Sequence, residues 1–181
     1  KLSKLLNKKK FLIFDLDGVL IDSKSNMRES WNYTVKKNNL NIPFKNYFKF
    51  IGLPFKNILV KLKINSRIFK FEKIKKDFVK QSLKNIHKIK PYKNARHVLQ
   101  IIKKRGKFIA LLTSKDYHRS KKIIKNLKFN FDHIECGSPQ KKGKPHPYQL
   151  MLILKKLKIK KQDAIYIGDM YPDLQTAKNA R

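Results

Sequence analysis

The stretch FLIFDLDGVL, from Phe11 to Leu20, decides the fold that we expect for this chain. Its first four residues, Phe11 to Phe14, are apolar and mostly aromatic or branched, which is typical of a buried strand in a parallel sheet. Asp15 and Asp17 follow directly, and side chains at positions i and i+2 of an extended segment point to the same side. Gly18 then allows a sharp turn or a close approach to a ligand. Because open α/β sheets bind ligands outside the carboxyl ends of their strands, these residues mark a candidate site.

A lone Asp-x-Asp pair could equally cap a helix or lie in a solvated turn. The composition argues against that reading, because the chain has only 12 Asp and Glu against 45 Lys and Arg. Two of these few acids stand beside an apolar strand. A pair of carboxylates in such a place is expected to hold a cation, share a proton or take part in a reaction.

The composition limits the class of protein. The chain has 181 residues, and 41% of them are hydrophobic, which is typical of one folded domain or of a core with a small insertion. A single cysteine, Cys136, excludes an internal disulfide and favours the cytoplasm. No apolar run approaches the ~20 residues of a membrane span, and the basic first ten residues lack the apolar part of a signal peptide. Because the sequence begins with Lys1, we interpret its N-terminus as trimmed.

The formal charge of +33 raises the possibility of a nucleic-acid partner. Arg contributes only 6 of the 45 basic residues, and the lysines are scattered along the whole chain. Base recognition favours Arg, and a binding surface would concentrate the charge. We therefore interpret the basicity as compositional drift and expect no dedicated nucleic-acid function, although the basic surface would attract anionic metabolites.

The hydrophobic pattern predicts alternating strands and helices around a parallel sheet. Strands are expected at 11–14, 108–112, 132–136 and 164–167, and helices at 95–105, 117–127, 148–157 and from 172 to the end. Between the first two strands, the pattern predicts helices but no convincing strand, at 24–38, 44–50, 55–62 and 67–89. We expect a core domain made of residues 1–20 and 91–181, and a helical cap domain made of residues 21–90.

Polar residues follow three of the predicted strands. These are Asp15 and Asp17, Thr113 and Ser114, and Asp169 with Asp173 shortly after it, while Lys144 lies in a loop at the same end. Strand ends of a parallel sheet converge, so these residues are expected at one site. Carboxylates for a divalent cation, hydroxyl and amide donors, and an amine are the groups that phosphoryl transfer uses.

Four motifs occur in order along the chain: DLDGV, the Thr of LLTS, the Lys of GKPHP, and GDMYPD. Together they resemble those of the haloacid dehalogenase-like (HAD) phosphohydrolases that carry a helical cap after the first strand. GKPHP and IGLP are most similar to the phosphoglycolate-phosphatase-like branch. The resemblance covers essentially the whole chain and implies a Rossmann-like parallel sheet, flanking helices and an inserted all-helical cap.

The resemblance also implies roles for three catalytic residues. Asp15 would be the nucleophile and form an aspartyl-phosphate, and Asp17 would be the general acid and then the general base. Lys144 would offset the charge of Asp15 and of the transferring phosphoryl group.

The remaining implied roles concern binding. Mg²⁺ would be held by the carboxylate of Asp15, the backbone carbonyl of Asp17, and Asp169, with Asp173 assisting directly or through a neighbour. Phosphate oxygens would meet Thr113, the Ser114 amide, Gly18 and Lys144. The expected substrate is a small phosphorylated metabolite such as phosphoglycolate or a sugar phosphate, and the expected assembly is a monomer or a homodimer.

The chain departs from the family in one respect. HAD cores usually have a strand after the last predicted helix, and this chain stops at Arg181 inside that helix. We expect an open sheet edge, explained either by a sequence that stops short or by a partner that covers the edge. A phosphomutase, a pyrophosphatase and a non-catalytic RNA-binding member are the alternative functions.

Overall fold

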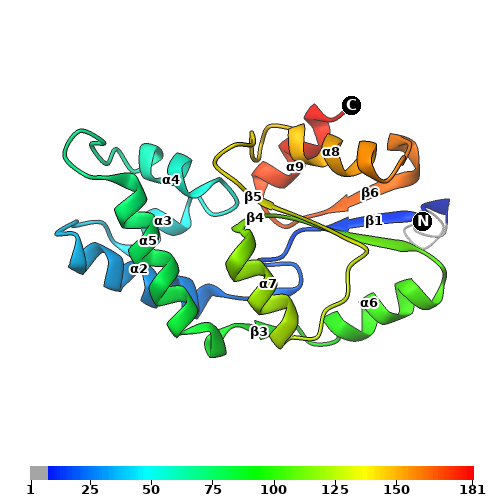
Figure 1. The fold of residues 1–181 in the computed structure, drawn as a ribbon, viewed down its shortest axis with the longest axis horizontal. Helices are drawn as coiled ribbons and strands as arrows, with labels where there is room; N and C mark the ends of the chain where they lie inside the picture. The colour runs from blue at the N-terminus through cyan, green and yellow to red at the C-terminus, as the bar shows by residue number, and fades with distance from the viewer. Residues whose placement is uncertain (1–7) are drawn as a thin grey trace.

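A parallel sheet with helices on both faces forms the centre of the molecule (Figure 1). The computed structural model describes residues 8–181. The strands of this sheet are β1 (Phe11–Phe14), β4 (Phe108–Asp116), β5 (His133–Gly137) and β6 (Ala164–Ile167), in the order β5-β4-β1-β6. β1 is central, and its last residue pairs with Leu111 of β4 and Ile167 of β6. The predicted α/β sheet is confirmed.

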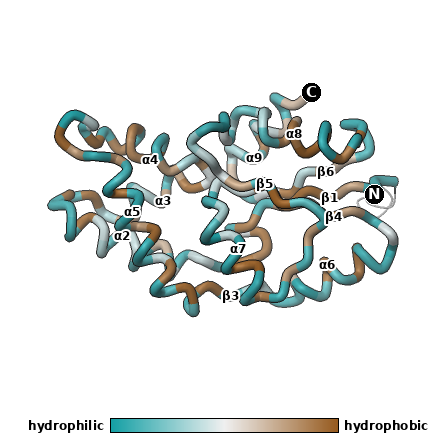
Figure 2. Tube along the Cα trace, viewed as in Figure 1, coloured by the Kyte–Doolittle hydropathy of each residue, from teal (hydrophilic) through white to brown (hydrophobic). Residues whose placement is uncertain are grey.

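The side chains of β1 alternate between two hydrophobic cores, as the two-residue period of a strand requires. Leu12 and Phe14 pack on the side of α6 (Ala95–Lys104) and α7 (Tyr117–Asn126). Ile13 packs on the other side, with α8 (Tyr148–Lys156) and the end of α9 (Tyr171–Asn179). In Figure 2 hydrophobic colour is prominent on the strands, while the helices alternate in colour. The first strand is therefore buried on both faces.

The helices α2 (Lys24–Lys37), α3 (Phe44–Phe48), α4 (Phe55–Lys61) and α5 (Phe71–Lys84) form a separate group at one end of the molecule (Figure 1). This group, the helical cap, has a hydrophobic core of its own, made by Trp31, Tyr47, Ile58, Leu59, Ile64, Ile74 and Phe78. The rings of Trp31 and Tyr47 stack at 4.4 Å between centroids. The domain boundaries at residues 20 and 90 stay a prediction.

The expectation that residues 21–90 contain no strand is wrong. The chain enters the cap through β2 (Ile21–Asp22) and leaves it through β3 (Lys90–Pro91), and these two segments pair in antiparallel fashion. Two-residue strands are too short to produce a hydrophobic pattern, so hydrophobic periodicity does not reveal them. Their pairing places the two connections to the cap side by side.

The helix expected at 67–89 is shorter than predicted, because polar side chains bind the backbone at both of its ends. The Asn65 side chain accepts a hydrogen bond from the backbone two residues on, at 2.9 Å, which favours a turn before α5. After α5, the Asn26 amide donates to the Asn85 carbonyl at 2.9 Å, and a 3₁₀ turn (Ile86–Lys88) follows. Hydrogen bonds from side chains to the backbone compete with those of the helix, and hydrophobic periodicity does not reveal this competition.

Within residues 8–181, β6 lies at the edge of the sheet and pairs only with β1. None of the helices in that part of the chain has both the length and the apolar composition that a membrane crossing requires.

Candidate active site

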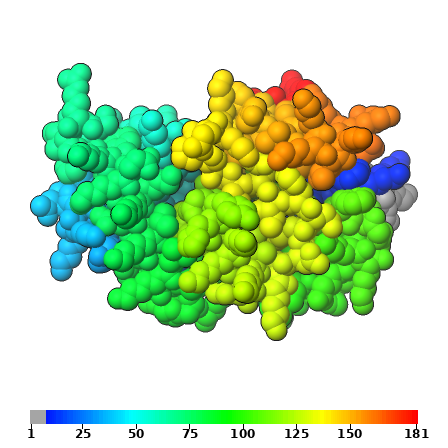
Figure 3. Space-filling view, in the orientation of Figure 1, coloured from blue at the N-terminus to red at the C-terminus, as the bar shows by residue number. Residues whose placement is uncertain are grey.

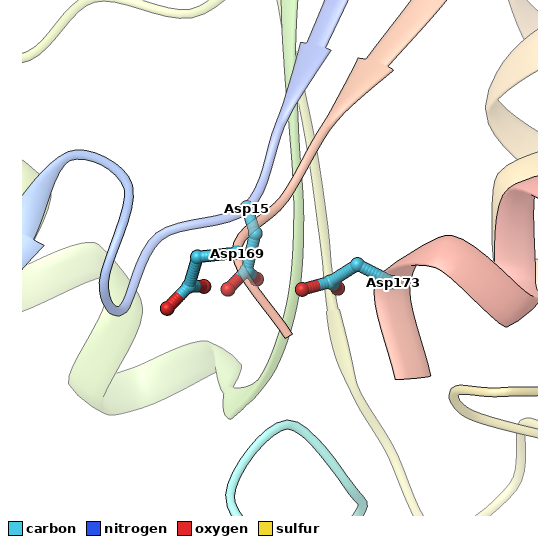
Figure 4. Close-up of side chains that lie close together, drawn as sticks. All are labelled: Asp15, Asp169 and Asp173. Atoms are coloured by element: carbon cyan, nitrogen blue, oxygen red, sulfur yellow. The ribbon is translucent and has the colours of Figure 1, made fainter. Parts of the chain in front are cut away.

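Carboxylates from β1, β6 and α9 meet at one edge of the sheet. Asp15 follows β1, Asp169 follows β6 by two residues, and Asp173 lies in the first turn of α9. One carboxylate oxygen of each lies within 4.8 Å of the others, and Figure 4 shows the three side chains next to one another. Asp15 and Asp173 are only 5% and 3% exposed, whereas Asp169 is exposed. The structure thus brings together three of the residues expected to bind metal.

Backbone pairing and two glycines make this approach possible. The backbone N–H of Asp15 donates to the Ile167 carbonyl at 2.8 Å, which holds the end of β1 against the end of β6. Gly18 has a φ of +84°, and a Cβ at that position would lie 2.0 Å from Oδ2 of Asp169. A Cβ at Gly168 would lie 2.4 Å from the Cβ of Asp173. Larger residues at either position would displace a carboxylate.

Lys144 lies between two of these carboxylates. Its Nζ is 2.7 Å from Oδ1 of Asp15 and 2.6 Å from Oδ1 of Asp173, and its side chain is 1% exposed. The loop between β5 and α8 carries this lysine to the strand ends, as the sequence predicted. A buried ammonium group needs such partners, because an unpaired buried charge is strongly unfavourable.

Asp173 is held by its neighbours on both oxygens. Tyr166 donates its hydroxyl to Oδ1 at 2.7 Å, and the backbone N–H of Met170 donates to Oδ2 at 3.1 Å. The Nζ of Lys144 also lies 5.3 Å from the centre of the Tyr166 ring. Asp173 therefore orients Lys144, and Tyr166 is a member of the site that the sequence analysis missed.

Burial and charge act in opposite directions on the protonation of this cluster. Burial raises the pKa of Asp15 to about 7, although the neighbouring Lys144 acts to lower it. Burial acts to lower the pKa of Lys144, but the carboxylates of Asp15 and Asp173 hold it above its ordinary value. Burial and the charges of Asp173 and Asp17 raise the pKa of Asp169. The negative charge of the three carboxylates is thus only partly offset by the ammonium group of Lys144.

The donor set fits a hard divalent cation. Three carboxylates face one ammonium group, so a cation would complete the charge balance, and carboxylate oxygens are the ligands that Mg²⁺ prefers. Asp169 is the most accessible of the three. The carboxylate of Asp17 is not part of this cluster among the described residues; the sequence prediction concerned its backbone carbonyl, and this stays a prediction.

Asp17 has its own pair of partners. The Ser23 hydroxyl donates to Oδ1, and the Nζ of Lys115 lies 3.1 Å from Oδ2. Ser23 stands at the position that would cap α2, but its side chain makes no cap hydrogen bond. Burial lowers the pKa of Lys115 below its ordinary value, although the charge of Asp17 acts to raise it. Sequence reasoning missed both partners; Lys115 lies two residues after Thr113, but nothing in the sequence separates it from the many other lysines.

β4 is longer than the expected 108–112 and continues through Asp116, so Thr113 and Ser114 lie within the strand. Thr113 is 1% exposed, and its hydroxyl accepts a hydrogen bond from the Lys115 backbone at 3.2 Å. The Ser114 hydroxyl donates to the carbonyl of Gly52 at 2.6 Å, in the loop between α3 and α4 of the cap. The phosphate-binding roles of Thr113, Ser114 and Gly18 stay predictions.

A pocket between the core and the cap is lined by four of the candidate residues. Asp15, Asp17, Thr113 and Ser114 line its core side together with Lys115 and Arg119, and the cap contributes Met27, Tyr47, Ile51, Leu53, Phe55, Ile58 and Phe78. The Arg119 guanidinium lies 5.3 Å from the Phe78 ring centre. In Figure 3 the cap and the core are in contact across the face shown. The site therefore has a charged floor and a largely apolar roof.

Known proteins resemble this chain in sequence and in fold. The sequence profile of the haloacid dehalogenase-like hydrolases matches residues 12–181. A phosphoglycolate phosphatase from Aquifex aeolicus is 32% identical over 174 residues, which cover 93% of this chain and 80% of that protein. A pyrophosphatase PpaX from Oceanobacillus iheyensis is 25% identical over 179 residues, covering 93% and 78%.

Among solved structures, a haloacid dehalogenase-like family protein from Streptococcus pneumoniae superimposes with a TM-score of 0.80 at 22% identity, covering 95% of this chain and 81% of that one. At that identity the likeness concerns the fold. The profile match and the relative at 32% identity establish the family of this chain. This chain belongs to the haloacid dehalogenase-like hydrolase family, in the phosphatase branch that contains phosphoglycolate phosphatases.

Proposed function

We propose that this chain is a Mg²⁺-dependent phosphomonoester hydrolase that works through an aspartyl-phosphate on Asp15. The observation that carries the proposal is the surroundings of Asp15, whose buried carboxylate borders two further carboxylates, the Lys144 ammonium and the pocket between the core and the cap. Such a carboxylate is held in place and kept from water, as a nucleophile requires. Its substrate would be a small anionic metabolite, such as phosphoglycolate or a sugar phosphate.

The reaction would take place in two steps. In the first, an oxygen of Asp15 bonds to phosphorus, the bond from phosphorus to the leaving oxygen breaks, and Asp17 gives a proton to that oxygen. In the second, the oxygen of a water bonds to phosphorus, the bond to Asp15 breaks, and Asp17 takes a proton from the water. Asp17 lines the same pocket as Asp15, which allows it to serve both steps.

When bound, Mg²⁺ would neutralise charge on the carboxylates and on the phosphoryl group. We propose Asp15, Asp169 and the Asp17 carbonyl as its ligands. Asp173, whose oxygens already have partners, would assist mainly by holding Lys144. Lys144 would then offset the charge of Asp15 and of the phosphoryl group.

The phosphate oxygens would be bound by groups at the strand ends. We assign this role to the Thr113 hydroxyl and the Ser114 amide, because both residues line the pocket. We also assign it to Lys144, which is paired with Asp15, and to the Gly18 turn, which adjoins Asp169. The cap would exclude water when it covers the pocket, with β2 and β3 as its hinge. The free thiol of Cys136 suits a cytoplasmic enzyme.

Inorganic pyrophosphate is the second substrate class that we consider. The relative from O. iheyensis is named a pyrophosphatase, and the pocket also contains the guanidinium of Arg119, which is paired with Asp116. Phosphate release from pyrophosphate, phosphoglycolate and sugar phosphates therefore belongs in one panel.

Asp15→Asn should reduce phosphate release from every active substrate of that panel to below about one thousandth, because the amide cannot act as the nucleophile. The matched control is Asp163→Asn, which changes an acid before β6 and outside the pocket and should retain the native rate. Turnover by Asp15→Asn near the native rate, or no turnover by the folded native chain on any substrate, would contradict the proposal.

Mg²⁺ should raise the melting temperature of the native chain, since a ligand that binds only the folded state stabilises it by about 2.7 kcal/mol at one hundred times its Kd. Asp169→Asn should lose most of this stabilisation. Gly18→Ala should lose it too, because its Cβ would displace the Asp169 carboxylate, whereas Gly106→Ala has a similar positive φ and no neighbour within 4 Å. Equal Mg²⁺ shifts in all four proteins would show that the cation binds elsewhere.

Lys144→Met should lower the free energy of unfolding by about 3–5 kcal/mol, because it leaves the carboxylates of Asp15 and Asp173 buried without their cation. Urea denaturation measures this loss. Adding Asp15→Asn to the Lys144→Met chain should recover part of the stability, since one uncompensated charge is removed. Lys142→Met, an exposed position in the same loop, should change the stability by less than about 0.5 kcal/mol. Indistinguishable effects of the two lysine variants would rule out the buried ion pair.

A further inference from the structure

Lys115 is a buried lysine to which the family motifs assign no function. It is 7% exposed and lies on the part of β4 that extends beyond the predicted strand. Its Nζ is 3.1 Å from Oδ2 of Asp17. Removing an ammonium group from water is costly, and a close carboxylate partner offsets that cost. The Lys115 side chain is thus committed to Asp17.

The two oxygens of Asp17 are held from different parts of the chain. Oδ1 accepts the hydroxyl of Ser23, which stands at the start of the cap, and Oδ2 faces Lys115, which belongs to the core. A carboxylate held at one oxygen can still rotate about its side-chain bonds. Contacts on both oxygens leave one orientation, in which Asp17 borders the pocket that also contains Asp15.

Lys115 also contacts a second residue of the pocket floor. Its backbone N–H donates to the hydroxyl oxygen of Thr113 at 3.2 Å. The same residue therefore fixes Asp17 with its side chain and Thr113 with its backbone. Only the first of these contacts depends on the lysine side chain, so a substitution at this position tests it separately.

We propose that Lys115 is a positioning residue that holds the Asp17 carboxylate toward the leaving oxygen of the substrate. The inference rests on the proposed function, because it assumes that Asp17 gives a proton to that oxygen as its bond to phosphorus breaks. Misplacing a proton donor by about 1 Å can cost on the order of 100-fold in rate. Lys115 acts through Asp17 and is not itself a catalytic residue.

Three phosphate esters distinguish a positioning role of Lys115 from direct binding of the leaving group and from a merely structural role. The quantity measured is kcat/KM, which reports the steps up to departure of the leaving group. Phosphoglycolate has an anionic alkyl leaving group, glycerol phosphate has a neutral one, and 4-nitrophenyl phosphate releases a phenolate that is a far weaker base. The two alkyl esters need the proton from Asp17, and the nitrophenyl ester hardly does. The native chain is expected to hydrolyse all three with Mg²⁺ present.

Lys115→Met should lower kcat/KM for both alkyl esters by about 10- to 100-fold and for the nitrophenyl ester by less than about threefold. Lys115→Arg keeps a cation beside Asp17 and should recover part of the alkyl-ester rate. Lys122→Met, an exposed position on α7, should leave all three values unchanged. Melting temperatures of the variants show whether each one is folded under the assay conditions.

Two results would overturn the inference while leaving the proposed hydrolase intact. A loss confined to phosphoglycolate would show that Lys115 binds an anionic leaving group directly. Equal losses with all three esters, unrelieved in Lys115→Arg, would show a merely structural role. If the folded native chain releases no phosphate from any ester, the proposed function fails first, and the inference fails with it.

Discussion

The buried ammonium group of Lys144 is the contact on which the arrangement of the site depends. It lies within 2.7 Å of one oxygen of Asp15 and one of Asp173. Without it, these two carboxylates would be buried next to each other and would repel each other. Lys144 offsets one charge, and the third carboxylate, Asp169, leaves the cluster short of positive charge. A divalent cation would offset that imbalance and could also bind an anionic phosphoryl group, which is why the cluster suits phosphoryl transfer.

Strand pairing and two glycines produce this arrangement. Parallel pairing of β1 with β4 and β6 brings three strand ends to one edge, and alternation along β1 buries both of its faces. Gly18 and Gly168 then remove the Cβ atoms that would push the carboxylates apart. The cap has its own hydrophobic core, lines the other side of the pocket, and contacts the core through the hydrogen bond from Ser114 to Gly52.

Much of this could be predicted from the sequence, because apolar runs that end in acids produce both a strand pattern and a chemical pattern. Asp15 and Asp169 were predicted in this way, whereas Lys144 was predicted from its GKPHP loop. Lys115 was not predicted, because one lysine among many carries no distinctive feature. The end of β4 that contains it is polar and lacks the hydrophobic pattern of a strand. The ends of α5 and the two short strands β2 and β3 depend on side-chain hydrogen bonds and tertiary pairing, which hydrophobic periodicity does not reveal.

The most direct test of Asp15 as the nucleophile is to find where the phosphoryl group goes during turnover. The folded native chain would be mixed with Mg²⁺ and a ³²P-labelled phosphomonoester that it hydrolyses, quenched in acid within one turnover, and digested for peptide mapping. Label on the carboxylate of Asp15 is the predicted result. Label on a different residue, or turnover with no labelled protein at any quench time, would contradict an aspartyl-phosphate at this position.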